Sequence, residues 1–173
     1  MKATLNVINQ MRADGIIGQY AIGGAIGATF YLEPTATFDI DVFISLQNAP
    51  GSLLVSLEPI YNYLKARGYN PENEYLVIEG WQVQFLPTAD ALDREALAEA
   101  VEASVEEIKT RVMTAEHLTA IALRTGRPKD KIRITQFIES GVLDQAKLEQ
   151  ILARHGLHEK WKRFKDKYIE AEE

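Results

Sequence analysis

The chain has 173 residues, 46% of them hydrophobic and 25% charged, with a net charge of −6, and this composition suits an ordinary globular protein with a sizeable core. The absence of cysteine excludes disulfides, thiolate metal sites and cysteine nucleophiles. Because no stretch reaches about 18 consecutive apolar residues and no basic segment precedes an apolar one at the N-terminus, we expect no membrane span, no secretion signal and a cytoplasmic location.

The first part of the chain alternates segments with helical and strand-like apolar spacing. In chain order they predict a helix over 4–12, a strand over 20–22, a helix over 25–32, a strand over 38–46, a helix over 57–67, and paired strands over 75–78 and 81–86. An acidic helix capped by Thr88 or Asp90 then runs through Ala103, and a further strand follows over 108–113.

Helices complete the chain, with predicted ranges 115–124, 128–140, 145–155 and 158–170. Thr114 and Asp144 are suitable N-caps for the first and third of them. This order predicts an α/β (α+β) fold, in which a mixed sheet is flanked by helices and followed by a C-terminal helical part. We assign residues 1–113 to the core and residues 114–173 to the helical part, packed on the core as one compact unit.

The strand over 38–46 carries the residues on which the functional prediction depends. Successive side chains of a strand point to opposite faces, so Asp39 and Asp41 share one face and the apolar residues between them share the other. Two carboxylates on one face repel each other unless a cation or solvent compensates them. Together with the Gly23-Gly24 turn that opens the preceding helix, they indicate a site for a divalent metal and a phosphate chain. Taken singly, each feature is also common without such a site, because Asp-x-Asp is a frequent sequence and Gly-Gly often separates a strand from a helix.

Gly23-Gly24, a helix and then Asp39-Ile40-Asp41 resemble the signature of the nucleotidyltransferase (polymerase-beta-like) superfamily. Within it, the segment that begins at Glu116 and ends in Gly126-Arg127-Pro128-Lys129-Asp130 is similar to the AbiEii-type toxin branch of type IV toxin–antitoxin systems. The resemblance covers residues 15–140. It implies a nucleotidyltransferase-like fold, Mg²⁺-dependent transfer of a nucleoside monophosphate from an NTP to an RNA or protein acceptor, and an antitoxin as a partner.

The resemblance also implies residue roles. Asp39 and Asp41 would be the catalytic residues and would hold Mg²⁺ bound to the NTP. The Gly23-Gly24 turn and the backbone amides of Ala25 and Ile26 would cradle the phosphates, because a side chain there would hold the phosphates away from the backbone.

The second motif implies that Lys129 neutralises the triphosphate and that Asp130 orients it. The alternative for Asp130 and the neighbouring arginines is a set of exposed charges at the start of a helix.

The chain departs from the family at the third carboxylate, which normally comes from a later strand of the core. The corresponding strand here presents Gln82 and Gln84, which are neutral and are poor ligands for Mg²⁺. Glu79 or Asp90, on either side of that strand, would have to substitute. The alternative function is therefore a catalytically weak or inactive nucleotide-binding or interaction protein of the same fold.

Charge is unevenly distributed along the chain. Residues 1–108 carry 5 Lys/Arg against 15 Asp/Glu, whereas residues 109–173 carry 14 against 10. The basic second part predicts attraction to a nucleotide or to nucleic acid, which leaves a plain RNA-binding module as a third hypothesis, or else it forms a solvated helical face.

The remaining chemically notable residues are assigned structural roles. The histidines lack metal-ligand spacing on one helix face and are expected at the surface; they are His117, His155 and His158. The aromatic residues of the last helix have helical spacing and predict a packing stripe; they are Trp161, Phe164 and Tyr168.

Overall fold

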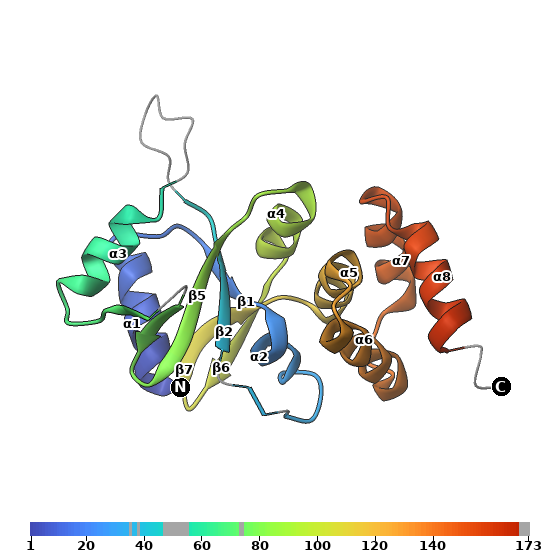
Figure 1. Cartoon of the computed structure of the whole chain (residues 1–173), viewed down its shortest axis with the longest axis horizontal. Coiled ribbons are helices and arrows are strands. Elements are labelled where there is room, and N and C mark those ends of the chain that lie inside the picture. Colours follow the sequence, from blue (N-terminus) through green and yellow to red (C-terminus); the bar gives the residue numbers. More distant parts are fainter. Residues whose placement is uncertain (35, 38, 47–55, 73–74, 170–173) are drawn as a thin grey trace.

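The computed structural model describes residues 1–34, 36–37, 39–46, 56–72 and 75–169. A seven-stranded mixed sheet lies at its centre, in the order β3-β4-β5-β2-β1-β7-β6 (Figure 1). The strands are β1 (Tyr20–Ile22), β2 (Asp39–Ile44), β3 (Pro71–Glu72), β4 (Tyr75–Ile78), β5 (Trp81–Pro87), β6 (Val101–Val105) and β7 (Ile108–Val112). Strand β2 is parallel to β5 and antiparallel to β1, so both of its edges are paired and its side chains are held firmly in place.

One face of the sheet is covered by α1 (Lys2–Ala13) and α3 (Glu58–Lys65), which lie on the same side of the strands in Figure 1. The apolar stripe of α1 packs with every second residue of β2, among them the fully buried Ile40 and Val42. This is the alternation that the sequence predicted, and it turns Asp39 and Asp41 to the opposite face.

That opposite face carries α2 (Gly24–Ala28), α4 (Ala91–Ala98) and α5 (Ala115–Thr125), and beyond them α6 (Pro128–Ser140), α7 (Gln145–Arg154) and α8 (His158–Tyr168) (Figure 1). A second core cluster joins Phe43 of the sheet and Leu92 of α4 to Leu118, Phe137 and Trp161 of the C-terminal helices. Within the described part of the chain, no helix is long and apolar enough to cross a membrane.

The α/β architecture with a C-terminal helical part agrees with the sequence prediction, but the predicted helix through Ala103 is wrong. Helix α4 ends at Ala98, and β6 follows and pairs antiparallel with β7. The turn between them is formed by Glu106 and Glu107, both with positive φ, at 49° and 71°. Tight hairpin turns of this kind usually carry Asn and Gly, so a Glu-Glu turn gives no sequence signal for the hairpin.

Glu95 of α4 connects this helix to the C-terminal helices. Its carboxylate accepts hydrogen bonds from Arg154 Nη2 at 2.5 Å and pairs with His155 Nε2 at 2.7 Å and with His117 Nε2 at 3.3 Å. The pKa of Glu95 is thereby lowered to about 2, chiefly by the hydrogen bond from Arg154. The surface position predicted for His117 is wrong, because this residue is fully buried between Glu95 and its own N-cap residue Thr114.

The cluster around Glu95 predicts stability that depends on pH. A carboxyl group whose pKa is depressed in the folded state stabilises the protein above its unfolded value of 4.5, and this contribution is lost as the pH falls towards about 2. Glu95→Gln should therefore lower the free energy of unfolding by about 1–2 kcal/mol at pH 7 and by about half as much at pH 3. Urea denaturation at both pH values measures the difference.

The matched control is Glu139→Gln, because Glu139 is exposed on α6 and lies outside the cluster around Glu95. Its effect should stay within about 0.5 kcal/mol. A loss for Glu95→Gln that is equally large at pH 7 and pH 3 would contradict an origin in charge.

Candidate functional site

The two aspartates of β2 lie next to the glycine turn that the sequence placed beside them. Asp39 and Asp41 are half-buried on the sheet face opposite Ile40 and Val42. The N–H of Gly23 donates to the backbone carbonyl oxygen of Asp41 at 2.9 Å, which fixes the turn against the strand.

Gly24 is required at this corner for two reasons. Its φ is +57°, a conformation that L side chains rarely adopt. A Cβ atom at this position would also lie 1.8 Å from Asp41 Oδ2. The Asp41 carboxylate therefore occupies the space that the missing side chain leaves free.

Gly23 serves a different purpose, because a Cβ there would lie 2.6 Å from the ring of Phe43. The first glycine thus allows the turn to pack on the sheet, and the second admits the carboxylate.

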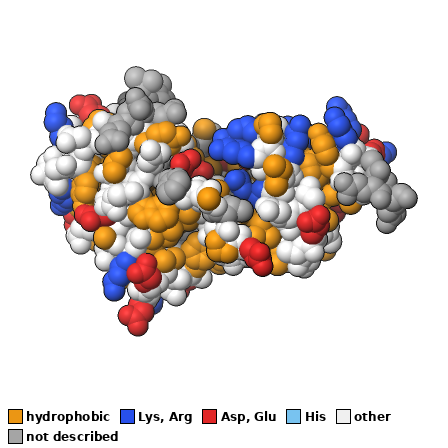
Figure 2. Space-filling view, turned by 60° about the horizontal axis from the view of Figure 1, so that its bottom comes forward, with side chains coloured by type: hydrophobic (Ala, Val, Ile, Leu, Met, Phe, Trp, Pro, Cys, Tyr) orange, Lys and Arg blue, Asp and Glu red, His pale blue; other side chains and the backbone are white. Residues whose placement is uncertain are grey.

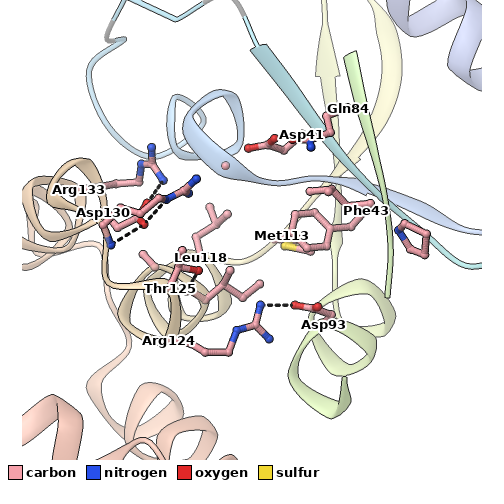
Figure 3. A pocket seen from close by; sticks show the side chains of 16 residues that line it. Asp41, Phe43, Gln84, Asp93, Met113, Leu118, Arg124, Thr125, Asp130 and Arg133 are labelled. Atoms are coloured by element: carbon pink, nitrogen blue, oxygen red, sulfur yellow. Dashed lines mark hydrogen bonds and ion pairs between the residues drawn. The ribbon is translucent and has the colours of Figure 1, made fainter. Parts of the chain in front are cut away.

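Helix α6 brings a group of charges to the same region. The buried carboxylate of Asp130 accepts hydrogen bonds from Arg127 Nε at 2.7 Å and from the Arg127 backbone N–H at 3.2 Å. Arg133 Nη1 contacts its other oxygen at 3.4 Å, and Figure 3 shows the Arg133 side chain beside Asp130. In this geometry Asp130 fixes the position of two arginines, and its carboxylate is occupied by them.

Removing that anchor should affect both stability and binding. Asp130→Asn leaves the largely buried Arg133 without its charge partner, and loss of one member of a buried ion pair costs about 3 kcal/mol. We expect a comparable fall in the free energy of unfolding and weaker NTP binding, measured by urea denaturation and by calorimetric titration. Asp144→Asn is the matched control, because Asp144 only caps α7 and asparagine caps equally well. Equal losses for both variants would contradict the anchoring role.

Two cavities meet at Asp41. The first, of about 420 Å³ and called here the basic cavity, is lined by Ala25, Asp39, Asp41, Arg127, Lys129 and Arg133 among others. The second, of about 360 Å³ and called here the apolar cavity, has walls that include Phe43, Leu86, Met113 and Leu118, together with Gly24 and Asp41. Arg127 and Arg133 line both cavities. Figure 2 shows Lys and Arg side chains gathered beside a hollow with acidic side chains across from them.

Burial is the main influence on Asp41. It raises the pKa of this carboxyl, while the nearby charges of Arg127 and Lys129 lower it and that of Asp39 raises it further. Within the described ranges, no hydrogen bond to the Asp41 carboxylate offsets the cost of its charge. A half-buried pair of carboxylates with so little direct compensation is a donor set that suits a divalent cation such as Mg²⁺.

The strand beside this pair carries amides in place of a third acid. In the parallel pairing of β2 with β5, Asp39 is in register with Gln82 and Asp41 with Gln84, so all four side chains lie on one face. The suggested substitutes are engaged elsewhere. Glu79 accepts a hydrogen bond from the Tyr69 hydroxyl at 2.5 Å, and Asp90 caps α4.

The site residues predicted from sequence thus fall around two adjoining cavities. Ala25, Asp39, Asp41 and Lys129 line the basic cavity, Gly24 and Asp130 line the apolar one, and Gly23 lies behind the turn against the sheet. Their catalytic and binding roles stay predictions.

Sequence reasoning missed the far wall of the apolar cavity, where Arg124 Nη2 pairs with Asp93 Oδ1 at 2.9 Å (Figure 3). These two residues lie on different helices, α5 and α4, and no local pattern connects them.

No protein-family model matches the chain, and a search of curated proteins finds no significant match. Solved structures do match. The crystal structure of an antigenic nucleotidyltransferase-like protein from Paracoccidioides brasiliensis gives a TM-score of 0.57 at 14% identity, over 87% of this chain and 84% of that one. The solution structure of the antibiotic-resistance factor ANT(2'')-Ia gives 0.54 at 16% identity, over 96% of both chains.

The crystal structure of ANT(2'')-Ia in complex with adenylyl-2''-tobramycin gives a TM-score of 0.52 at 16% identity, over 95% of this chain and 98% of that one. At such identities the likeness concerns the fold. The mixed sheet, the helices on its two faces and the C-terminal helical part therefore form a nucleotidyltransferase-like fold.

Proposed function

We propose that this protein transfers a nucleoside monophosphate from an NTP to an acceptor, in a Mg²⁺-dependent reaction. The observation that carries the proposal is the contact between the Asp41 carboxylate and Gly24, at the junction of a cavity rich in cationic side chains and a cavity with apolar walls.

Each group at the site has a role in this reaction. Asp39 and Asp41 hold Mg²⁺, which supplies charge stabilisation to the oxygens of the transferring phosphoryl group. The backbone at Gly24 and Ala25 leaves room for the phosphate chain to approach closely. Lys129 reaches the triphosphate in the basic cavity, and Arg127 and Arg133, held by Asp130, add positive charge where the two cavities meet.

The finer assignment rests on the resemblance of the segment from Glu116 to Asp130 to AbiEii-type toxins. On that ground we propose an RNA or protein acceptor and an antitoxin partner. The cysteine-free composition is the ground on which we propose a cytoplasmic location. The structural neighbour ANT(2'')-Ia, whose complex contains adenylyl-2''-tobramycin, illustrates that a protein of this fold accommodates a nucleotidyl group joined to an acceptor.

The test is incubation of the protein with α-labelled NTPs, Mg²⁺ and cellular RNA or protein. We expect a labelled product that disappears when Mg²⁺ is chelated and when Asp41 is replaced with alanine. Equal labelling by Asp41→Ala would reject the assignment.

Gln84 favours a second function, an inactive nucleotide-binding or interaction protein of the same fold. It stands in register with Asp41, where an acid would complete a set of three carboxylates. Calorimetry separates the two functions, because NTP binding without turnover on any acceptor supports the inactive scaffold, and turnover excludes it.

A further inference from the structure

Among the described residues, the wall of the apolar cavity next to Asp41 has no side chain that can take up a proton. Gln84 lies beside Asp41 in Figure 3 and lines this cavity, and its amide has no basicity at neutral pH. A hydroxyl acceptor must lose its proton as it attacks phosphorus, and enzymes provide a positioned base for this purpose. The histidines in the described chain lie outside the linings of both cavities.

The other carboxylates that line the apolar cavity are occupied. Asp130 is enclosed by Arg127 and Arg133. Burial raises the pKa of Asp93, which would suit a base, but its Oδ1 accepts a hydrogen bond from Arg124. In Figure 3 this pair also lies on the opposite side of the cavity from Asp41, with Phe43 and Met113 on the intervening wall.

The same cavity is well supplied with groups that bind an anionic acceptor. Arg124, Arg127 and Arg133 all line it. A guanidinium group matches the oxygens of a phosphate in a bidentate fashion. Asp130 takes the Nε–Nη2 edge of Arg127, at 2.7 and 3.2 Å, which leaves the Nη1 end of a side chain that is 53% exposed.

Resting on the proposed function, we propose that the acceptor attacks through an oxygen that is already ionised, and that this oxygen belongs to a phosphate monoester. The second ionisation of such a group has a pKa of about 6, so at neutral pH the nucleophile needs no base. The reaction then needs no carboxylate at the position of Gln84. An amide there does not repel the incoming dianion, and it has no proton to accept.

The reaction balances without proton transfer from the acceptor. One phosphate monoester oxygen forms a bond to the α-phosphorus of the NTP, and the bond between that phosphorus and the oxygen bridging to the β-phosphorus breaks. Pyrophosphate leaves with the electron pair of this bond. The product carries the nucleoside monophosphate through a new diphosphate linkage.

The phosphate has two sources, an RNA end or a small phosphorylated compound with an apolar body, and the experiment includes both. An RNA with a 5′-monophosphate and the same RNA with a 5′-hydroxyl, each with its 3′ end blocked, are incubated with α-labelled NTP and Mg²⁺. Phenyl phosphate and benzyl alcohol form the small-molecule pair. We expect at least about 10-fold more label on a phosphorylated acceptor than on its hydroxyl partner, and release of that label by an enzyme that cleaves diphosphate bridges.

Gln84→Glu provides the internal test. A carboxylate beside Asp41 supplies the missing base, so transfer to the hydroxyl acceptors should rise while transfer to the phosphorylated ones falls. Gln82→Glu is the matched control, because it adds the same charge to the same strand face, in register with Asp39 and outside both cavity linings, and should not raise hydroxyl transfer.

Label on the hydroxyl acceptors equal to or above that on the phosphorylated ones would overturn the inference and leave the proposed function standing. Efficient transfer to a hydroxyl acceptor by the wild type that Asp93→Asn abolishes would also overturn the inference alone, because Asp93 would then be the base. Absence of label on every acceptor, from wild type and from Gln84→Glu, would instead overturn the proposed function and this inference with it.

Discussion

Asp41→Asn is expected to abolish nucleotidyl transfer while making the folded protein more stable. The amide has the same shape as the carboxylate and fits beside Gly24, but it has no charge with which to hold Mg²⁺. We expect transfer to fall by at least about 10³-fold, the scale on which charge stabilisation of a transferring group contributes to catalysis.

The gain in stability follows from the same burial. The pKa of Asp41 is raised because the folded protein desolvates its charged form. At pH 7 the ionised carboxylate therefore costs stability, and Asp41→Asn removes this cost, giving a gain of about 0.5–2 kcal/mol. As the pH falls through the raised pKa towards 3.8, Asp41 of the folded wild type binds a proton. The difference in the free energy of unfolding between wild type and Asp41→Asn then disappears.

Urea denaturation between pH 7 and pH 4 measures this difference in the free energy of unfolding, and the transfer assay at pH 7 measures activity. Asp166→Asn is the matched control, because Asp166 is exposed on α8 and its replacement should change neither stability nor transfer. A destabilised Asp41→Asn protein that retains transfer would contradict both the metal-holding role and the burial argument.

The gain in stability tests the role of Asp41 without the need for any acceptor. A carboxylate retained for structure stabilises the fold through its partners, as Asp130 does with Arg127 and Arg133. Asp41 lies half-buried without such contacts in the described chain, so its unfavourable burial supports the proposed cation site.

The sequence alone predicts the central part of the site because the pattern there is local. Strand period places Asp39 and Asp41 on one face, and the glycine pair marks the turn that faces them. The helices from Thr114 onwards also follow from local signals, since Thr114 and Asp144 each cap a helix through a side-chain oxygen and Gly141 ends one.

The parts that were missed depend on contacts between distant segments. The walls of the apolar cavity come from β2, β5, α4, α5 and α6 and from Met113 just after β7, and the Arg124–Asp93 pair joins two helices. His117 appears polar in sequence but is buried, because Glu95 and Thr114 satisfy its ring nitrogens. The hairpin of β6 and β7 was hidden by a Glu-Glu turn in an unusual conformation. The cavity walls and the environment of His117 require the tertiary fold before they can be recognised, whereas the hairpin is local and was missed because its turn residues are unusual.

Gly24→Ala is expected to have the second large effect, and it tests the contact on which the proposed function depends. The added methyl group would lie 1.8 Å from Asp41 Oδ2, so the carboxylate must move away from the corner. The backbone at φ +57° adds a cost of about 1–2 kcal/mol for a residue with a side chain. We expect reduced stability together with loss of both NTP binding and transfer, measured by urea denaturation, calorimetry and the labelling assay.

Gly141→Ala separates the effect of the clash with Asp41 from the cost of a side chain at positive φ. Gly141 ends α6 with a similar φ of +68°, and a Cβ there would meet nothing within 4 Å. This variant carries the backbone cost without the clash, so it should lose about 1 kcal/mol of stability and keep wild-type transfer. If Gly24→Ala also kept wild-type transfer, the position of the Asp41 carboxylate against the turn would be irrelevant to the reaction. A loss of transfer confined to Gly24→Ala would instead mean that the reaction requires a bare backbone beside the carboxylate, which is the arrangement that a metal-bound triphosphate needs.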